Sequence, residues 1–155
     1  MSELSGQIRA DMVAAMKAHD DLMLSTLRMA ISAIQNEEVA GKQARELTDA
    51  DVVAVLNREV AKRRDSAEAY TAGNRPELAA KELSEVEILQ HYLPAALSEA
   101  ELAALVAEEL GAARDALGVK PTMKQMGLVM KAVTARVAGR ADGSKVAALV
   151  RSALA

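Results

Sequence analysis

Apolar residues recur every three to four positions along almost the whole chain. This spacing is typical of α-helices that bury one face. The pattern is interrupted at Gly41–Lys42, at Ala72–Gly73, at Pro94 and in the segment Gly139–Gly143. No stretch alternates apolar and polar residues for long enough to indicate a β-strand. The sequence therefore predicts an all-α protein whose helices are separated by these breaks.

Residues that can cap a helix stand just before most of the apolar stripes. Ser98 and Thr122 each precede a Glu or a Gln by three residues, which is the spacing of a capping box. Asn74 is followed by an early Pro and then by an acid, a combination typical of a first helical turn. Further helix starts are predicted near Ser2, Asp20, Thr48 and Asp142.

The apolar stripes supply the predicted core. In the first predicted helix the stripe consists of Leu4, Ile8, Met12 and Met16. In the fourth it consists of Leu78, Leu83, Val86 and Leu89. The chain contains no Phe and no Trp, so Leu, Val, Ile, Met and Ala must fill the interior. These residues suit helical packing, whereas strands rich in aromatic residues are missing.

The distribution of charge divides the chain near Pro94. Residues 1–95 hold eleven basic and sixteen acidic residues, a net charge of −5. Residues 96–155 hold eight basic and six acidic residues, a net charge of +2. Proline also disfavours a helical conformation in the residue before it. We therefore predict two domains: an N-terminal helical domain of about four helices at residues 1–94, and a three-helix tail domain at residues 95–155.

The composition limits the cellular compartment in which the chain is expected and the kinds of reactive or metal-binding site that it can form. The absence of Cys excludes disulfides, thiolate nucleophiles and cysteine metal sites, and it fits a reducing cytoplasm. No run approaches the roughly 20 apolar residues that span a membrane, and the N-terminal segment lacks an apolar signal core. We expect a cytoplasmic protein with no membrane partner.

No group of residues in the sequence suggests a catalytic centre, a metal site or a cofactor. The chain has no GxSxG or SxxK nucleophile motif and no Walker motif for ATP. His19 and His91 are far apart and belong to no metal-binding pair. The carboxylates of Glu37–Glu38, and those of Glu85 and Glu87, are interpreted as parts of solvated helix faces, because side chains close together in a helix diverge.

The final segment, from Gly118 to Ala155, differs in charge from the rest of the chain. It holds seven basic residues and one acid, a net charge of +6, in a chain whose formal net charge is −3. A basic helical surface on an acidic protein is typical of an anion-binding surface, and RNA is the natural candidate. The basic residues are Lys120, Lys124, Lys131, Arg136, Arg140, Lys145 and Arg151.

The predicted RNA-binding site consists of Lys124, Gly127, Lys131, Gly139, Arg140 and Lys145. Lys124 and Lys131 are about two helical turns apart and therefore share a face. Arg140 and Lys145 flank the start of the last helix, where free amides and the helix dipole favour a phosphate. Gly127 either admits an RNA backbone or ribose, or serves a tight helix–helix contact. The tail has no aromatic residue, so we expect recognition of phosphates and shape instead of stacking on bases.

A secondary basic patch is predicted at Lys62, Arg63 and Arg64. Both RNA contact and ordinary pairing with Glu59 and Glu68 on the same helix can explain it. The segment Gly139–Gly143 lacks the GK[ST] ending of a phosphate-binding loop. It is instead predicted to end one helix and to cap the next.

Several separate blocks, in the same order, resemble the GatB/YqeY family. They are Ser25–Met29, Ala33–Glu38, Glu59–Ser66, Glu85–Pro94, Leu97–Glu99, Lys124–Met130 and Gly139–Gly143. Together they extend over most of the chain, which resembles a stand-alone YqeY-type member of this family.

The resemblance implies an all-helical fold with a small helical tail similar to the C-terminal domain of GatB. In GatB, a subunit of glutamine-dependent tRNA amidotransferases, such a tail helps to hold tRNA. The resemblance therefore implies a non-catalytic accessory protein that binds tRNA or another structured RNA, and it brings amidotransferase subunits into consideration as partners. Two alternatives remain open: a protein-interaction adaptor, and a component of a carbon–nitrogen ligase that uses glutamine as amido donor.

Overall fold

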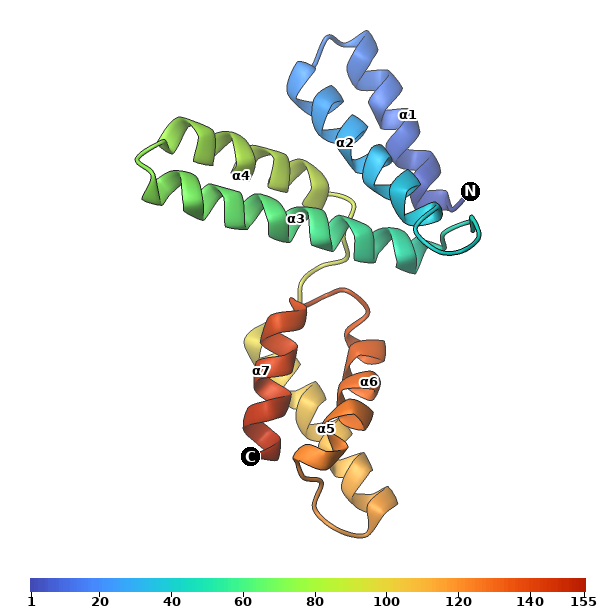
Figure 1. The fold of residues 1–155 in the computed structure, drawn as a ribbon, viewed down its shortest axis with the longest axis vertical. Coiled ribbons are helices and arrows are strands. Elements are labelled where there is room, and N and C mark those ends of the chain that lie inside the picture. Colours follow the sequence, from blue (N-terminus) through green and yellow to red (C-terminus); the bar gives the residue numbers. More distant parts are fainter. The chain divides into compact units, whose positions relative to one another are not determined.

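The computed structural model describes all 155 residues and contains helices but no strand, so the prediction of an all-α protein is confirmed. The chain forms two compact units, Met1–Leu93 and Pro94–Ala155 (Figure 1). That each unit is a domain able to fold alone stays a prediction. No helix is both long enough and apolar enough to cross a membrane. The helices are α1 (Glu3–Lys17), α2 (Asp21–Glu38), α3 (Asp49–Ala72), α4 (Pro76–Gln90), α5 (Glu99–Leu117), the 3₁₀ helix η1 (Met123–Gln125), α6 (Met126–Val137) and α7 (Gly143–Leu154).

The first unit consists of two helical hairpins, α1–α2 and α3–α4 (Figure 1). The predicted caps Ser2, Asp20 and Thr48 are confirmed, because each side chain accepts a hydrogen bond from a backbone amide of the helix that follows. One aliphatic core joins all four helices and includes the fully buried Ile8, Leu27, Ile34, Leu56 and Leu89.

The prediction that Asn74 caps α4 is wrong. The cap residue is Arg75, whose side chain makes no capping hydrogen bond, and Pro76 opens the helix. Asn74 instead has a φ of 57°, a left-handed conformation that Asn tolerates better than most residues do. Asn74 therefore makes the turn between α3 and α4.

Two predicted core positions are also wrong, because Met16 is 48% exposed and Leu83 is 49% exposed. In α1, Ala15 is buried in place of Met16, which lies about 100° further round the helix. In α4, Glu85 is buried. The interpretation of Glu85 as part of a solvated face is therefore wrong, and α4 turns Leu83 towards solvent instead.

Glu85 is buried because it pairs with Arg63, which is itself only 4% exposed. Arg63 Nε donates to Glu85 Oε2 at 3.0 Å, and Arg63 Nη1 donates to Glu59 Oε2 at 2.9 Å. Lys62 Nζ lies 2.8 Å from the other oxygen of the Glu59 carboxylate. Burial acts to raise the pKa of Glu59, but the hydrogen bonds from Lys62 and Arg63 outweigh it and hold the pKa below its usual value.

The second unit packs α5, α6 and α7 around a smaller aliphatic core that includes Val106, Val133 and Val150. Capping boxes are present at Ser98 and at Thr122, as predicted. The prediction for Gly139–Gly143 is also confirmed. After α6, Ala138 and Gly139 have φ values of 48° and 79°, and Asp142 then caps α7.

We predict that Arg63→Ala lowers the free energy of unfolding of the chain by about 3–5 kcal/mol, because it leaves the carboxylate of Glu85 buried and unpaired and leaves Glu59 with Lys62 alone. Arg64→Ala is the matched control, since Arg64 is the next residue and is exposed. Urea unfolding followed by circular dichroism measures both variants. A loss below about 1 kcal/mol for Arg63→Ala would show that the ion pairs do not hold α3 and α4 together.

Candidate nucleic-acid interface

The lysines Lys124 and Lys131 are both exposed, on η1 and α6 of the second unit. Neither takes part in an ion pair with an acidic residue. Between them, Gly127 is exposed, and a Cβ atom placed on it would meet no atom within 4 Å. The helix–helix contact considered for Gly127 is therefore excluded within this unit, and open space remains on that side of α6.

An apolar side chain that the sequence analysis did not single out lies on the same face. Leu128 follows Gly127 and is 57% exposed, while the inward side of α6 carries the buried Val129, Val133 and Val137. The sequence contained a usable signal, because Leu128 stands outside the spacing of the apolar stripe of α6. The outer face of η1 and α6 thus combines two cations with an accessible apolar residue.

Arg136, on α6, does not contribute a free positive charge. Its Nη2 lies 2.8 Å from Glu108 Oε2 and its Nη1 lies 3.1 Å from Glu109 Oε1. Both acids belong to α5 and therefore lie outside the segment Gly118–Ala155, which holds seven basic residues and one acid. The charge of that segment therefore overstates the positive charge of the folded surface.

Arg140 is half-buried and binds backbone of its own unit. Its Nε donates to the carbonyl oxygen of Ala95 at 2.9 Å, and its own carbonyl oxygen accepts from Leu97 N at 2.8 Å. Arg140 thus fastens the segment before α5 to the α6–α7 connection. This structural role competes with the predicted contact to a phosphate.

The start of α7 is already occupied by a carboxylate. Asp142 Oδ1 accepts a hydrogen bond from Ser144 N at 2.8 Å, and Lys145 is exposed in the same first turn. An anion at this end of the helix would meet the charge of Asp142, which weakens the predicted phosphate contact there. Gly139 is half-buried and shapes the preceding connection through its left-handed conformation.

The secondary basic patch is not a continuous surface. Arg63 is buried between Glu59 and Glu85, so its guanidinium is not exposed for the predicted contact with RNA. Lys62 is paired with Glu59, and Arg64 is exposed. The pairing of Arg63 with Glu59 along α3 is confirmed.

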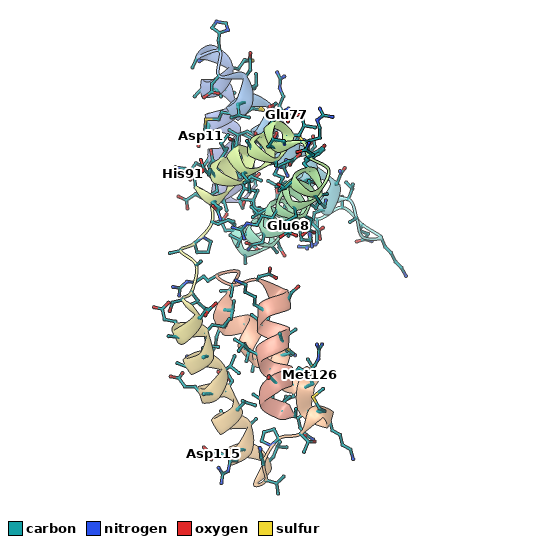
Figure 2. The ribbon with its side chains drawn as sticks, turned by 90° about the vertical axis from the view of Figure 1, so that its left-hand side faces the viewer. Asp11, Glu68, Glu77, His91, Asp115 and Met126 are labelled. Atoms are coloured by element: carbon teal, nitrogen blue, oxygen red, sulfur yellow. The ribbon has the colours of Figure 1, made fainter.

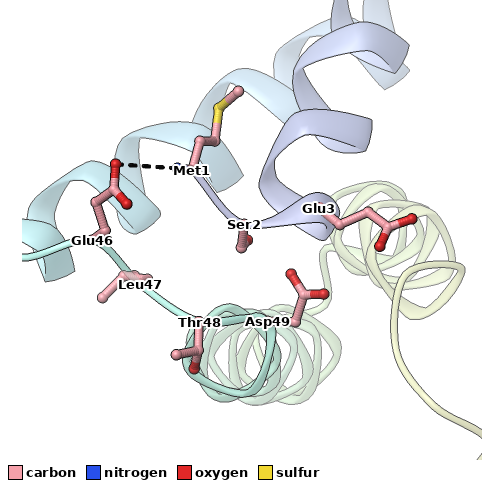
Figure 3. A pocket seen from close by; sticks show the side chains of 7 residues that line it. All are labelled: Met1, Ser2, Glu3, Glu46, Leu47, Thr48 and Asp49. Carbon is pink, nitrogen blue, oxygen red and sulfur yellow. Dashed lines mark ion pairs between the residues drawn. The ribbon is translucent and has the colours of Figure 1, made fainter.

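An open hollow of about 370 Å³ lies in the first unit (Figure 3). Its hydroxyl groups serve as helix caps: Ser2 accepts from Ser5 N, and Thr48 accepts from Asp51 N. The amine of Met1 pairs with Glu46 at 3.2 Å. The side chains of Ser2, Glu46, Thr48 and Asp49 are therefore engaged in the structure itself, and the lining residues form no nucleophile–base arrangement.

The end of α4 is fixed to α1 by a hydrogen bond. The hydroxyl group of Tyr92 donates a hydrogen bond to Asp11 Oδ2 at 2.5 Å. Burial is the main reason why the pKa of Tyr92 lies well above its usual range, and the contact with Asp11 raises this pKa further. Figure 2 labels Asp11 and His91. The rings of His91 and Tyr92 pack edge to face, with 5.6 Å between the ring centroids. No group of three or more His, Asp or Glu side chains converges as a metal site would require.

Fold and surface together define an all-helical protein with a basic helix face. The chain belongs to the family of YqeY-like proteins, whose sequence profile matches residues 5–154. The resemblance to the tail of GatB stays a prediction.

The relatives of the chain include mitochondrial proteins named altered inheritance of mitochondria protein 41. The one from Lachancea thermotolerans is 34% identical over 125 residues, which are 77% of this chain and 66% of the relative. The one from Vanderwaltozyma polyspora is 33% identical over 86 residues, 56% of this chain and 46% of the relative. The chain thus spans about two thirds of the first relative and about half of the second. Because these relatives are named as mitochondrial, the cytoplasmic location of this chain stays a prediction.

We predict that Arg140→Ala destabilises the second unit by about 1–3 kcal/mol, since it removes a hydrogen bond from a charged donor to the carbonyl of Ala95. Lys145→Ala, which removes an exposed cation from the same region, should leave stability within about 0.5 kcal/mol of the parent. Hydrogen exchange of the amides of α5 and α7 measures the effect locally. Equal protection in the two variants would contradict the anchoring role of Arg140.

Proposed function

We propose that this chain is a non-catalytic accessory protein that binds tRNA or a similar folded RNA. The contact is made by the outer face of η1 and α6 in the unit Pro94–Ala155. The observation that carries the proposal is the pair of exposed, unpaired lysines Lys124 and Lys131, with the open backbone at Gly127 between them. A cationic face of this kind suits the phosphate backbone and carries no sequence information by itself.

The contacts of the other candidates divide the predicted site into parts. Lys124, Gly127 and Lys131 form the proposed contact face. Lys145, in the next helix α7, adds a positive charge to the same unit. Arg140 supports the contact face only indirectly, by holding the fold of the unit, because its guanidinium donates a hydrogen bond to the carbonyl oxygen of Ala95. The acidic unit Met1–Leu93 does not attract RNA by charge, so its proposed role is to bind a protein, with amidotransferase subunits as the candidates that the resemblance to GatB brings in.

A protein-interaction adaptor is the second candidate function. It is favoured by exposed apolar residues within one stretch of the second unit: Leu117, Val119, Met123 and Leu128. Apolar residues that gather at a surface are typical of protein contacts. A partner that stays bound to the chain after nuclease treatment, and is released by Leu128→Asp, would favour the adaptor over the RNA-binding protein.

We predict that Lys124→Glu/Lys131→Glu abolishes or strongly weakens binding to bulk tRNA. In the conservative form Lys124→Gln/Lys131→Gln, two lost phosphate contacts should lower the slope of log K against log salt concentration by about 1.4–1.8. Fluorescence anisotropy across a salt series measures both quantities. Lys17→Glu/Lys42→Glu is the control, because it makes the same change of charge at two exposed lysines of the first unit.

Two outcomes would remove parts of this proposal. If the parent chain does not bind tRNA at low salt, the RNA-binding function is wrong. If both double charge reversals weaken binding equally, binding follows the net charge of the chain, and the assignment to α6 is wrong.

We predict that Gly127→Gln weakens tRNA binding severalfold without unfolding the unit, because the new side chain occupies the open space over α6. Gly127→Ala should raise the stability of the unit by about 0.5–1 kcal/mol, since alanine favours the helix more than glycine does. Gly111→Gln is the matched control on α5, because Gly111 is likewise exposed and without a neighbour within 4 Å. Equal affinities of the two Gln variants would show that RNA does not approach Gly127.

A further inference from the structure

One donor of the buried Arg63 guanidinium has only a weak acceptor. Nε and Nη1 donate to carboxylate oxygens of Glu85 and Glu59, and Nη1 also donates to the carbonyl oxygen of Glu59 at 3.2 Å. Nη2, in contrast, donates to the sulfur atom of Met29 on α2, at 3.8 Å. A thioether is a poor acceptor compared with an oxygen atom. The Nη2 group would therefore gain from an oxygen acceptor at the position of the sulfur.

The charge of the surrounding network specifies what kind of acceptor fits. The carboxylates of Glu59 and Glu85 face the cations Lys62 and Arg63, so the network is balanced. A further anion would be buried in excess and unfavourable. A neutral, strongly dipolar oxygen would satisfy Nη2 without disturbing the balance.

Met29 can supply such an oxygen when its sulfur is oxidised to the sulfoxide. It is 52% exposed, so a small solute can reach it even though its sulfur contacts the buried Arg63. The chain has eight Met and no Cys, so every sulfur atom that an oxidant can meet is a thioether. The sulfoxide of methionine is polar and is reversible by dedicated reductases.

We propose that Met29 is a site of reversible oxidation by hydrogen peroxide, and that the sulfoxide oxygen takes the place of the sulfur as the acceptor for Arg63 Nη2. In the step, the sulfur lone pair forms a bond to one peroxide oxygen while the O–O bond breaks. The sulfur loses two electrons, the peroxide is reduced, and the second oxygen leaves as water with both protons.

Oxidation of Met29 should stabilise the fold, whereas oxidation of a methionine in an apolar core destabilises it. A sulfoxide in a packed apolar site disrupts the packing. At Met29, the new oxygen strengthens a contact between α2 and α3, because a hydrogen bond from a charged donor to oxygen replaces one to sulfur. Met16 and Met123 are exposed to 48% and 45% and serve as internal references for reactivity, because an arginine hydrogen bond is made to the sulfur of Met29 and not to theirs.

The test compares the parent chain with Met29→Leu before and after treatment with hydrogen peroxide. Peptide mass spectrometry measures the oxidised fraction of each methionine, and circular dichroism measures the melting temperature. We expect Met29 to be oxidised, and the change in melting temperature to be more favourable in the parent than in Met29→Leu by about 4 °C. Treatment with methionine sulfoxide reductase should reverse this difference.

A second variant, Met29→Gln, supplies a neutral oxygen acceptor without any oxidation. It should melt above Met29→Leu and should not respond to peroxide at this position. The proposal is overturned if Met29 stays reduced while Met16 and Met123 are converted. It is equally overturned if oxidation lowers the melting temperature of the parent as much as that of Met29→Leu, or if Met29→Gln melts no higher than Met29→Leu.

Discussion

The arrangement of the first unit depends on one buried guanidinium. Arg63 contacts Glu59 on its own helix, Glu85 on α4 and Met29 on α2. Removing these charges from water is costly, and the cost is offset only when each charge has its partner in place. The network therefore favours one rotation of α4 about its axis, the one that buries Glu85 and exposes Leu83. Aliphatic side chains alone would tolerate several rotations, because their contacts have little direction.

The second unit is fixed in a different way, without a buried ion pair. Its core consists mainly of Val and Leu side chains, and its polar contacts are the helix caps, the contacts of the connections, and the surface ion pairs of Arg136 with Glu108 and Glu109. Arg140 bonds the segment before α5 to the connection between α6 and α7. With the interior satisfied by apolar packing and caps, the charged side chains of α6 lie at the surface. This is the physical basis for proposing that the unit presents a binding surface.

Three arginines and two lysines of this chain differ in their contacts. Arg63, Arg136 and Arg140 are all held by protein oxygen atoms. Lys124 and Lys131 are exposed and unpaired. The planar guanidinium offers several donors in a fixed geometry and suits a defined partner, whereas the ammonium group of Lys is strongly hydrated and stays in water. A count of basic residues therefore overstates the positive charge that is free at the surface of the second unit, where Lys124 and Lys131 are unpaired.

The sequence by itself determined the helical class, the caps at Ser98 and Thr122 and the break at Gly139–Gly143, because these depend on neighbouring residues. It also indicated that Lys124 and Lys131 are exposed, on η1 and α6. Only the tertiary structure decided which charges are free. The burial of Arg63 and Glu85, the binding of Arg136 by α5 and of Arg140 by Ala95, and the open space at Gly127 all arise between segments distant in the chain. Local spacing carries no information about such contacts, because they depend on how each helix is rotated against its neighbours.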